Sequence, residues 1–467
     1  MTARADEQDP LDAIPDYREG GFSKAEGEDM LRLPLEVVTP IYGGGVRPRR
    51  PDDLEPVRVA SIRGALRIWW RALEAPRYAT PTGLYDAERL LWGGLAREHG
   101  GVTRSPVVLA VDEVVSTALD ETDIALGQDD AYALWPARAM KVRGEPPAPR
   151  RRPGVRFTLS VTYPAAFDDA VRRTLRAWLL FGGIGGRTRR GCGAVAITDE
   201  TLRSKWLPAD LSAASLAKHL APKGGPDRHV STLSGARLAY GAPQASATTA
   251  WHASIKWLRD FRQGAATTRD VADRGGHARM RPSTQQGPQG RPGRSRWPEP
   301  DKIRQHFGKR SFDHEPLPGH GREMAWPRAA FGLPMEVRFQ SKQRDGSYYP
   351  LRPPPDVALA WTHTKGKDGV WELIDRLASP LVIRPVQLAD GRFVPVALWM
   401  SRALPAGAKA GLYNRGGFLE ERSLADINRV IAPDDTANFT PLAGKSSVRE
   451  AFMDHLLTLA GLRGVTL

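Results

Sequence analysis

The segment from Phe181 to Ala194 reads FGGIGGRTRRGCGA, with six glycines and three arginines between its two ends. Glycine lacks a Cβ, so its backbone can adopt positive φ angles and can approach other groups closely. Arginine side chains add forked donors that match phosphate oxygens. Two interpretations fit: a glycine-rich turn with solvated arginines, or a loop that binds a polyanion. The same composition recurs in TPIYGGGVRPRR, residues 39–50, and this recurrence favours polyanion binding.

Two nucleotide-binding motifs can be excluded from the order of elements around this loop. A P-loop needs G-x-x-x-x-G-K-[ST], and neither Lys-Ser nor Lys-Thr follows these glycines. Gly191 to Ala196 matches the dinucleotide fingerprint G-x-G-x-x-A by letter, but that motif lies between a strand and a following helix. Here the apolar spacing predicts a helix over 168–181 before the loop, and the β-rich AVAIT of 194–198 follows it. The order is therefore reversed.

Length and charge narrow the class of protein. The 467 residues suffice for two or more hydrophobic cores, and Lys and Arg number 67 against 53 Asp and Glu, which gives a net charge of +14. Such an arginine-rich excess suits nucleic acid. The first thirty residues are acidic and lack the apolar core of a signal peptide, and no run of about 18 apolar residues could span a bilayer. Cys192 is the only cysteine, which excludes an internal disulfide and a multi-cysteine zinc site. We expect a soluble, cytoplasmic, basic protein.

The first half of the chain predicts a disordered acidic arm at 1–29 and an α+β domain at 30–200. Its elements follow the order strand, helix, strand, strand, helix, strand, which is the order of a ferredoxin-like, RRM-type domain. The predicted strands are 31–40, 105–115, 155–163 and 194–198, and the predicted helices are 61–73 and 168–181.

The second half predicts an irregular basic insertion or linker at 201–330, with one or more helices, and a second ferredoxin-like domain at 331–467. Within the linker we expect a helix at 250–261 and, after it, a segment at 262–310 that holds twelve basic residues against four acidic ones. That segment is too polar to bury enough apolar area to order itself alone. The second domain is expected to comprise strands at 331–340, 379–388 and 392–401 and a helix near 447–461.

The predicted helix that begins at Ser61 has one apolar and one basic face. Ser61 is a natural N-cap, and Gly64 inside the helix costs about 1 kcal/mol relative to alanine, which indicates that something approaches its surface. The basic face is either solvated or a surface that tracks phosphates, and the glycine–arginine segments on both sides favour phosphates. We expect the tryptophan pair in the core. The basic stripe comprises Arg63, Arg67 and Arg71, and the apolar arc comprises Ile62, Ala65, Leu66, Ile68, Trp69, Ala72 and Leu73.

No catalytic arrangement emerges from the histidines and carboxylates. The adjacent acids Asp112 and Glu113 lie in a predicted strand and should point to opposite faces. His99 is expected in a surface loop, and the histidines of the irregular region lack metal-ligand spacing; they are His277, His306, His314 and His320. We therefore expect a binding protein without a metal or cofactor. A ribonuclease that uses histidine as acid or base remains the alternative.

Five segments together resemble a known family: TPIYGGG, SIRGALRIWWRAL, LWGG at 91–94, GGIGGRTRRGCG, and RLASPLVIRP at 376–385. They are similar to the RAMP proteins of CRISPR–Cas systems and, more narrowly, to the subunit-one members of the type III-B Cmr effector complex. The resemblance implies two ferredoxin-like RAMP domains in an antiviral ribonucleoprotein. It also implies binding near the 3′ end of the guide RNA, beside other RAMP subunits, and capture of target RNA without cleavage.

The resemblance places an RNA-binding surface on matching positions of this chain. The glycine-rich loop of the family falls on Gly182 to Gly193, and its basic helix falls on the Arg63, Arg67 and Arg71 stripe. Guide RNA, target RNA and other RAMP subunits are the implied partners, and an endoribonuclease that processes CRISPR precursor RNA is the competing class. The candidate RNA-binding residues are Tyr42, Gly43, Gly44, Gly45, Arg63, Arg67, Arg71, Gly182, Gly183, Gly185, Arg187, Arg189 and Arg190.

Overall fold

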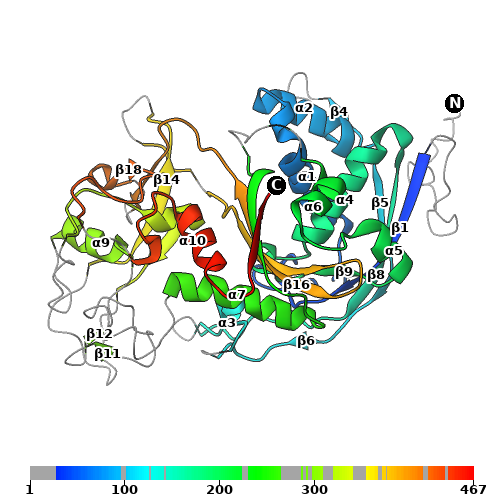
Figure 1. Cartoon of the computed structure of the whole chain (residues 1–467), viewed down its shortest axis with the longest axis horizontal. Coiled ribbons are helices and arrows are strands. Elements are labelled where there is room, and N and C mark those ends of the chain that lie inside the picture. Colours follow the sequence, from blue (N-terminus) through cyan, green and yellow to red (C-terminus); the bar gives the residue numbers. More distant parts are fainter. Residues whose placement is uncertain are drawn as a thin grey trace, which may run out of the picture.

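The computed structural model describes two ferredoxin-like units and a third, inserted sheet (Figure 1). The described residues are 28–95, 101–125, 128–140, 144–222, 224, 230–263, 286–287, 291–292, 297–308, 319–339, 354–366, 371–374, 376–413, 419–436 and 440–467. The predicted acidic arm lies outside them except for its last two residues. Within this part of the chain, no helix is long and apolar enough to cross a bilayer.

The first unit has the predicted order of elements, and its antiparallel sheet has the strand order β5-β8-β1-β9. Along β1, Leu33 and Leu35 point into the core while Arg32 and Glu36 alternate with them, as the period of two for a strand requires. This confirms the predicted α+β, ferredoxin-like fold. The elements are β1 (Glu28–Val37), α1 (Val59–Glu74), β5 (Val108–Val115), β8 (Val155–Pro164), α4 (Asp168–Phe181) and β9 (Val195–Ile197).

The second unit repeats this arrangement, with the strand order β15-β16-β10-β19. Its first strand and helix come from the segment in which the sequence predicts an irregular linker, so this unit extends well upstream of residue 331. Gly235, at φ +70°, and a register shift between Thr232 and Arg237 interrupt the regular alternation of the first strand, which hides it in the sequence. The elements are β10 (Thr232–Tyr240), α7 (Ala247–Gln263), β15 (Leu381–Gln387), β16 (Phe393–Ser401), α10 (Val448–Leu457) and β19 (Arg463–Thr466).

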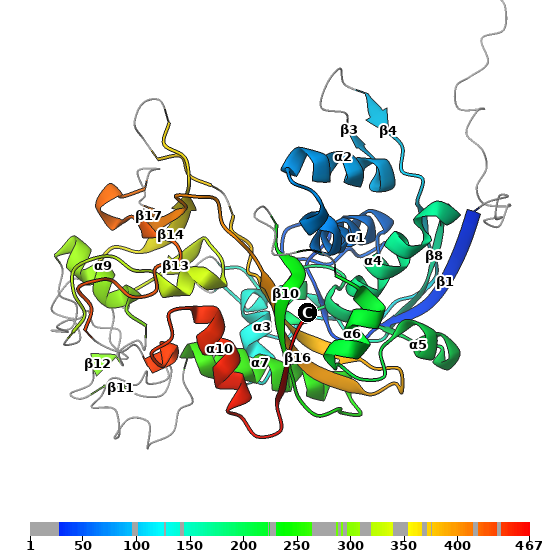
Figure 2. The same ribbon diagram turned by 45° about the horizontal axis from the view of Figure 1, so that its top comes forward.

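A third sheet is inserted into the second unit and forms a lobe at one end of the molecule (Figure 2). Its strands are β13 (Met335–Val337), β14 (Val357–Thr362), β17 (Lys409–Tyr413) and β18 (Ala425–Asp426), and α9 (Glu299–Phe307) packs on the same core through Ile303. Within α9, the buried Lys302 Nζ lies 2.6 Å from Asp435 Oδ1. Paired buried charges thus order the end of the 262–310 segment, whereas most of the rest of that segment lies outside the described residues.

Shorter elements lie between these strands and helices along the chain. They are β2 (Ile41–Tyr42), α2 (Pro81–Trp92), β3 (Gly94–Leu95), β4 (Val102–Thr103), β6 (Leu119–Asp120), α3 (Ala131–Leu134), β7 (Arg150–Arg151), α5 (Glu200–Trp206), α6 (Ala213–Leu220), β11 (Gln286–Gly287) and β12 (Arg291–Pro292). The segment at 188–190 inside the glycine loop forms one turn of 3₁₀ helix.

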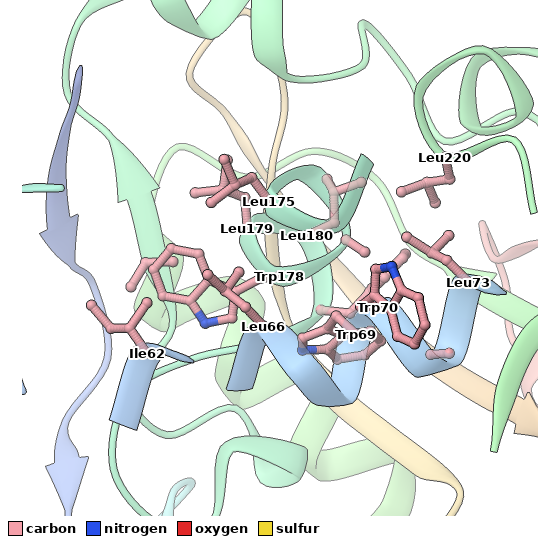
Figure 3. Close-up of a cluster of buried hydrophobic side chains, with 14 of the residues drawn as sticks. Ile62, Leu66, Trp69, Trp70, Leu73, Leu175, Trp178, Leu179, Leu180 and Leu220 are labelled. Carbon is pink, nitrogen blue, oxygen red and sulfur yellow. The ribbon is translucent and has the colours of Figure 1, made fainter. Parts of the chain in front are cut away.

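The two units stack in layers. Helices α1 and α4 lie between the first sheet and one face of the second. One hydrophobic core therefore contains Leu66 and Leu175, which Figure 3 shows, and Val396 of the second sheet. Helices α7 and α10 cover the other face of the second sheet, where Trp251 and Phe452 are buried. Because the units share a core, residues of the first unit that follow α4 contact the second unit directly.

Helix α1 differs from the expectation in two details. It begins at Val59, with Arg58 rather than Ser61 at the N-cap. Its buried face is rotated toward Trp70, which is 4% exposed, while Ile68 is 49% exposed. The layer above the helix includes α4, and Trp69 stacks near Phe181 with ring centroids 5.9 Å apart. Both tryptophans therefore belong to the core, as predicted.

Candidate nucleic-acid interface

The two glycine-rich segments contact each other through their backbones. The N–H of Gly186 donates to the carbonyl of Tyr42 at 2.6 Å. A Cβ on Gly44 would lie 2.8 Å from the Cα of Gly185, which itself has φ +81°. No residue with a side chain fits that approach without a shift. The sequence recurrence is thus explained in part by packing of one glycine segment on the other.

Two of the three loop arginines, Arg189 and Arg190, contact the second unit. Arg189 Nη1 donates to the carbonyl of Ser379 at 2.7 Å, and Arg190 Nη1 donates to that of Leu381 at 2.9 Å. In return, Trp251 Nε1 of α7 donates to the carbonyl of Arg190 at 2.7 Å. Arg187, at φ +57°, donates to the carbonyl of Ala133. The loop therefore forms the junction between the two ferredoxin-like units.

These loop arginines have neutral partners. Among the described residues, no carboxylate forms an ion pair with Arg187, Arg189 or Arg190, although carboxylates pair with many other arginines of the chain. Burial lowers the pKa of Arg189, and it lowers the pKa of Arg190 to about 9, to which the positive charges of Arg262, Arg187 and Arg189 contribute. The guanidinium groups stay charged at neutral pH, so positive charge accumulates at the junction.

The basic stripe of α1 lies against α2 and the segment before β5. Arg63 Nη1 donates to Ser105 Oγ at 2.9 Å and to the carbonyl of Val107 at 3.0 Å. Arg67 and Arg71 both bind Glu88 of α2, whose side chain is 1% exposed. The side chains of Arg67 and Arg71 remain 27% and 37% exposed. Glu88 thus neutralises much of the predicted stripe; the sequence analysis missed this acid, although its place on an amphipathic helix was a usable signal.

The first glycine turn has an exposed basic tip and a buried base. Gly43 and Gly44 have φ +59° and +91°, and Gly45 N–H donates to the carbonyl of Arg50 at 2.9 Å. Arg47 lies exposed on the tip. Tyr42 is buried, and its hydroxyl donates to the carbonyl of Pro136 at 3.3 Å. Its ring is therefore packed against the protein.

Packing also accounts for the glycines that begin the loop. A Cβ on Gly182 would lie 2.7 Å from Trp69 Nε1, and one on Gly183 would lie 2.7 Å from the carbonyl oxygen of Gly193. Contact of RNA with these glycines and with the α1 arginines stays a prediction.

The paired acids of β5 do not point to opposite faces, contrary to the sequence prediction. A bulge follows Asp112, and Glu113 has φ +54°. Asp112 accepts from Ser160 Oγ at 3.2 Å and Glu113 accepts from Thr158, and these two hydroxyls lie on the same face of β8. The bulge adds one residue and brings both carboxylates to one face.

The histidines occupy separate environments. His320 Nδ1 lies 3.0 Å from Asp301 Oδ2 in the inserted lobe, and burial lowers the pKa of His306. His99, His277 and His314 lie outside the described residues. Across the described ranges, no three His, Cys, Asp or Glu residues are grouped so that they could hold a metal ion.

Comparison with known proteins adds one family match. Residues 34–196 match the family model of the RAMP superfamily. No curated protein sequence matches the chain.

Among solved structures, the chain is similar to two Cmr proteins. The apo crystal structure of Cmr1 from Pyrococcus furiosus is 15% identical, with 93% of this chain and 98% of that chain covered and a TM-score of 0.47. A chain of the type III-B Cmr-beta complex bound to cognate target RNA is 12% identical, with 80% and 95% covered and a TM-score of 0.41. The family match runs from within β1 to within β9. The first ferredoxin-like unit of this chain is thus similar to the RAMP superfamily across nearly all of its elements.

Proposed function

We propose that this protein is a non-catalytic RNA-binding subunit of a type III-B CRISPR (Cmr) effector ribonucleoprotein. In this role it lies near the 3′ end of the guide RNA and helps to capture target RNA in antiviral defence. The RAMP match over residues 34–196 supports the family, and the motifs at 61–73 and 376–385 support the narrower assignment. Guide RNA, target RNA and other RAMP subunits are the proposed partners.

One observation carries the RNA-binding role: the glycine loop gathers three arginines whose partners are backbone carbonyls and hydroxyls. Arg187 and Arg189 each donate to a single carbonyl and so keep further N–H donors, whose fork geometry matches phosphate oxygens. Their charges are not cancelled by carboxylates among the described residues. A phosphate backbone laid along this junction would supply the missing negative charge.

The alternative to a subunit that binds RNA without cleaving it is a metal-independent ribonuclease. A metal-independent ribonuclease needs a general acid or base within hydrogen-bond reach of the scissile phosphate. His320 is buried beside Asp301 in the inserted lobe, so it is poorly placed to reach a bound RNA strand. Replacing each histidine by alanine and measuring RNA cleavage therefore tests the ribonuclease alternative.

The test mixes the protein, in excess, with end-labelled guide RNA and a matching target, with EDTA, Mg²⁺ or Mn²⁺. We expect both RNAs to be bound and to stay intact in every condition. Cleavage that disappears when any one histidine is replaced by alanine would establish the ribonuclease instead. Absence of binding to either RNA would refute the proposed function itself.

A further inference from the structure

We propose that Arg262 and Arg402 of the second unit complete a composite phosphate-binding site together with the three arginines of the glycine loop. The ligand is the phosphodiester backbone of single-stranded RNA, held by both ferredoxin-like units at once. This inference rests on the proposed function and assigns two further residues to it, from a part of the chain outside the glycine-rich segments.

The segment before and at the start of β15 brings the arginines together. Arg402, directly after β16, donates from Nη1 to the carbonyl of Ala378 at 2.6 Å. The next carbonyl, that of Ser379, accepts from Arg189 at 2.7 Å, and Arg190 contacts the Oγ of Ser379 at 3.4 Å. Residues 378–381 therefore anchor arginines from both units side by side.

Arg262 approaches the same junction from the last turn of α7. Its guanidinium lies over the ring of Phe331 with 4.9 Å between its Cζ and the ring centroid. The same helix supplies Trp251, which donates to the carbonyl of Arg190. The Phe331 ring beneath Arg262 lies 5.4 Å from the ring of Trp399 on β16, and Trp399 pairs with Leu381, whose carbonyl accepts from Arg190. After burial, the positive charge of Arg262 also contributes to lowering the pKa of Arg190.

The charge of this group is uncompensated. Among the described residues, the interactions of Arg262 and Arg402 are with a ring face and a carbonyl, and no carboxylate pairs with either. Burial lowers the pKa of Arg402 to about 10, and the charge of Arg189 acts in the same direction. Gathering like charges in a partly desolvated junction costs free energy, which a bound anion offsets. Each of the five residues is largely buried but keeps part of its surface exposed.

The chemistry of the cluster favours RNA over an acidic protein. All five cations are arginines, whose planar forks bind phosphate oxygens in pairs. Arg402 is also anchored next to Arg189 and Arg190 of the glycine loop, for which we propose RNA binding. A chain of phosphates can contact guanidinium groups from two units at successive positions, and this explains why the cluster spans the junction.

The experiment compares the double variant Arg262→Ala/Arg402→Ala with wild type and with Arg338→Ala/Arg392→Ala. The control pair removes the same charge from exposed arginines that pair with Glu336 and Asp390. The Kd for a 20-nucleotide single-stranded RNA is measured across a series of KCl concentrations, and a thermal melt of each variant reports its fold. Each phosphate contact contributes about 0.7 to the log–log salt slope, so we expect the first variant to lose about 1.4 and the control to lose none.

A third variant, Arg262→Lys/Arg402→Lys, keeps the charges and so should keep the slope while it binds RNA more weakly than wild type. It also guards against misfolding, because it removes less packing than alanine. If wild type binds RNA and Arg262→Ala/Arg402→Ala keeps the wild-type slope, the composite site is wrong and the proposed function stands. If Arg262→Ala/Arg402→Ala keeps the wild-type salt slope for RNA but no longer binds a neighbouring RAMP subunit, the site binds an acidic protein surface instead. If wild type does not bind RNA, both proposals fail.

Discussion

Glu88 of α2 holds two arginines of α1 in a half-buried ion network. Its side chain is 1% exposed, and Arg71 Nη2 donates to its Oε1 at 2.8 Å. A carboxylate in such a position receives charge-assisted hydrogen bonds from both guanidinium groups. The network joins α2 to α1, and its carboxylate offsets part of the positive charge of Arg67 and Arg71.

Replacement of Glu88 by glutamine should therefore destabilise the fold. It leaves two guanidinium groups without their counter-charge, which we expect to cost about 2 kcal/mol after allowance for their partial exposure. Urea unfolding followed by tryptophan fluorescence measures the change. Asp390→Asn, which removes one partner of an exposed pair, serves as the control and should change the free energy of unfolding by less than about 0.5 kcal/mol. An equal effect of both substitutions would contradict the account of this network.

Cys192 is a fully buried residue of the glycine loop, and burial raises its pKa to about 12. Because the thiolate is the reactive form, the folded protein should react slowly with a thiol reagent at pH 8, whereas the protein in urea should react at the rate of a free thiol. Cys192 is the only cysteine, so the total signal reports this one site. Fast labelling of the folded protein would show that the loop opens or is packed differently.

The sequence correctly predicts helices and strands whose apolar residues recur with a regular period. The helix predicted at 168–181 matches α4 at both ends, because its apolar spacing is uninterrupted and Gly182 terminates it. Strand β10 escaped prediction because Gly235 and a register shift break its alternation. The face of Glu113 was predicted wrongly because a bulge is set by backbone geometry that single-strand periodicity does not encode.

The sequence indicates which residue types form the glycine loop, but it does not indicate which residues its arginines contact. Glycine and arginine content located the loop correctly at the junction of elements. The Glu88 network and the contributions of Arg262 and Arg402 depend on contacts between residues distant in sequence, which local patterns do not specify.

Gly185→Ala and Gly64→Ala should change the free energy of unfolding in opposite directions. The first tests the packing of the two glycine segments, and the second serves as a control inside α1. Gly185 has φ +81°, and a Cβ there would lie 2.8 Å from Ile41 Cγ2, so Gly185→Ala should lower the free energy of unfolding by about 2 kcal/mol. Gly64 lies inside α1 with nothing within 4 Å of its would-be Cβ among the described residues, so Gly64→Ala should raise it by about 0.5–1 kcal/mol. Thermal or urea unfolding measures both. Stabilisation by Gly185→Ala would mean that the two glycine segments are not in contact.

The layered stacking of the two similar units explains where the positive charge collects. The first unit places its glycine loop at the end of α4, and the shared core brings that loop against β15 and α7 of the second unit. Neither unit alone would assemble the five arginines. We infer that RNA binding and the relative position of the two units depend on each other, since the same arginines serve both.

If the loop arginines bind RNA phosphates, as we propose, they contribute to the salt dependence of RNA affinity. The measurement compares wild type, Arg187→Ala/Arg189→Ala/Arg190→Ala, and the matched control Arg156→Ala/Arg338→Ala/Arg392→Ala, whose three arginines are exposed and paired with carboxylates. Both variants lose the same net charge, and thermal melts confirm that each is folded. We predict that the log–log slope falls by about two units in the loop variant and stays at the wild-type value in the control. A folded loop variant with the wild-type slope and affinity would contradict the account.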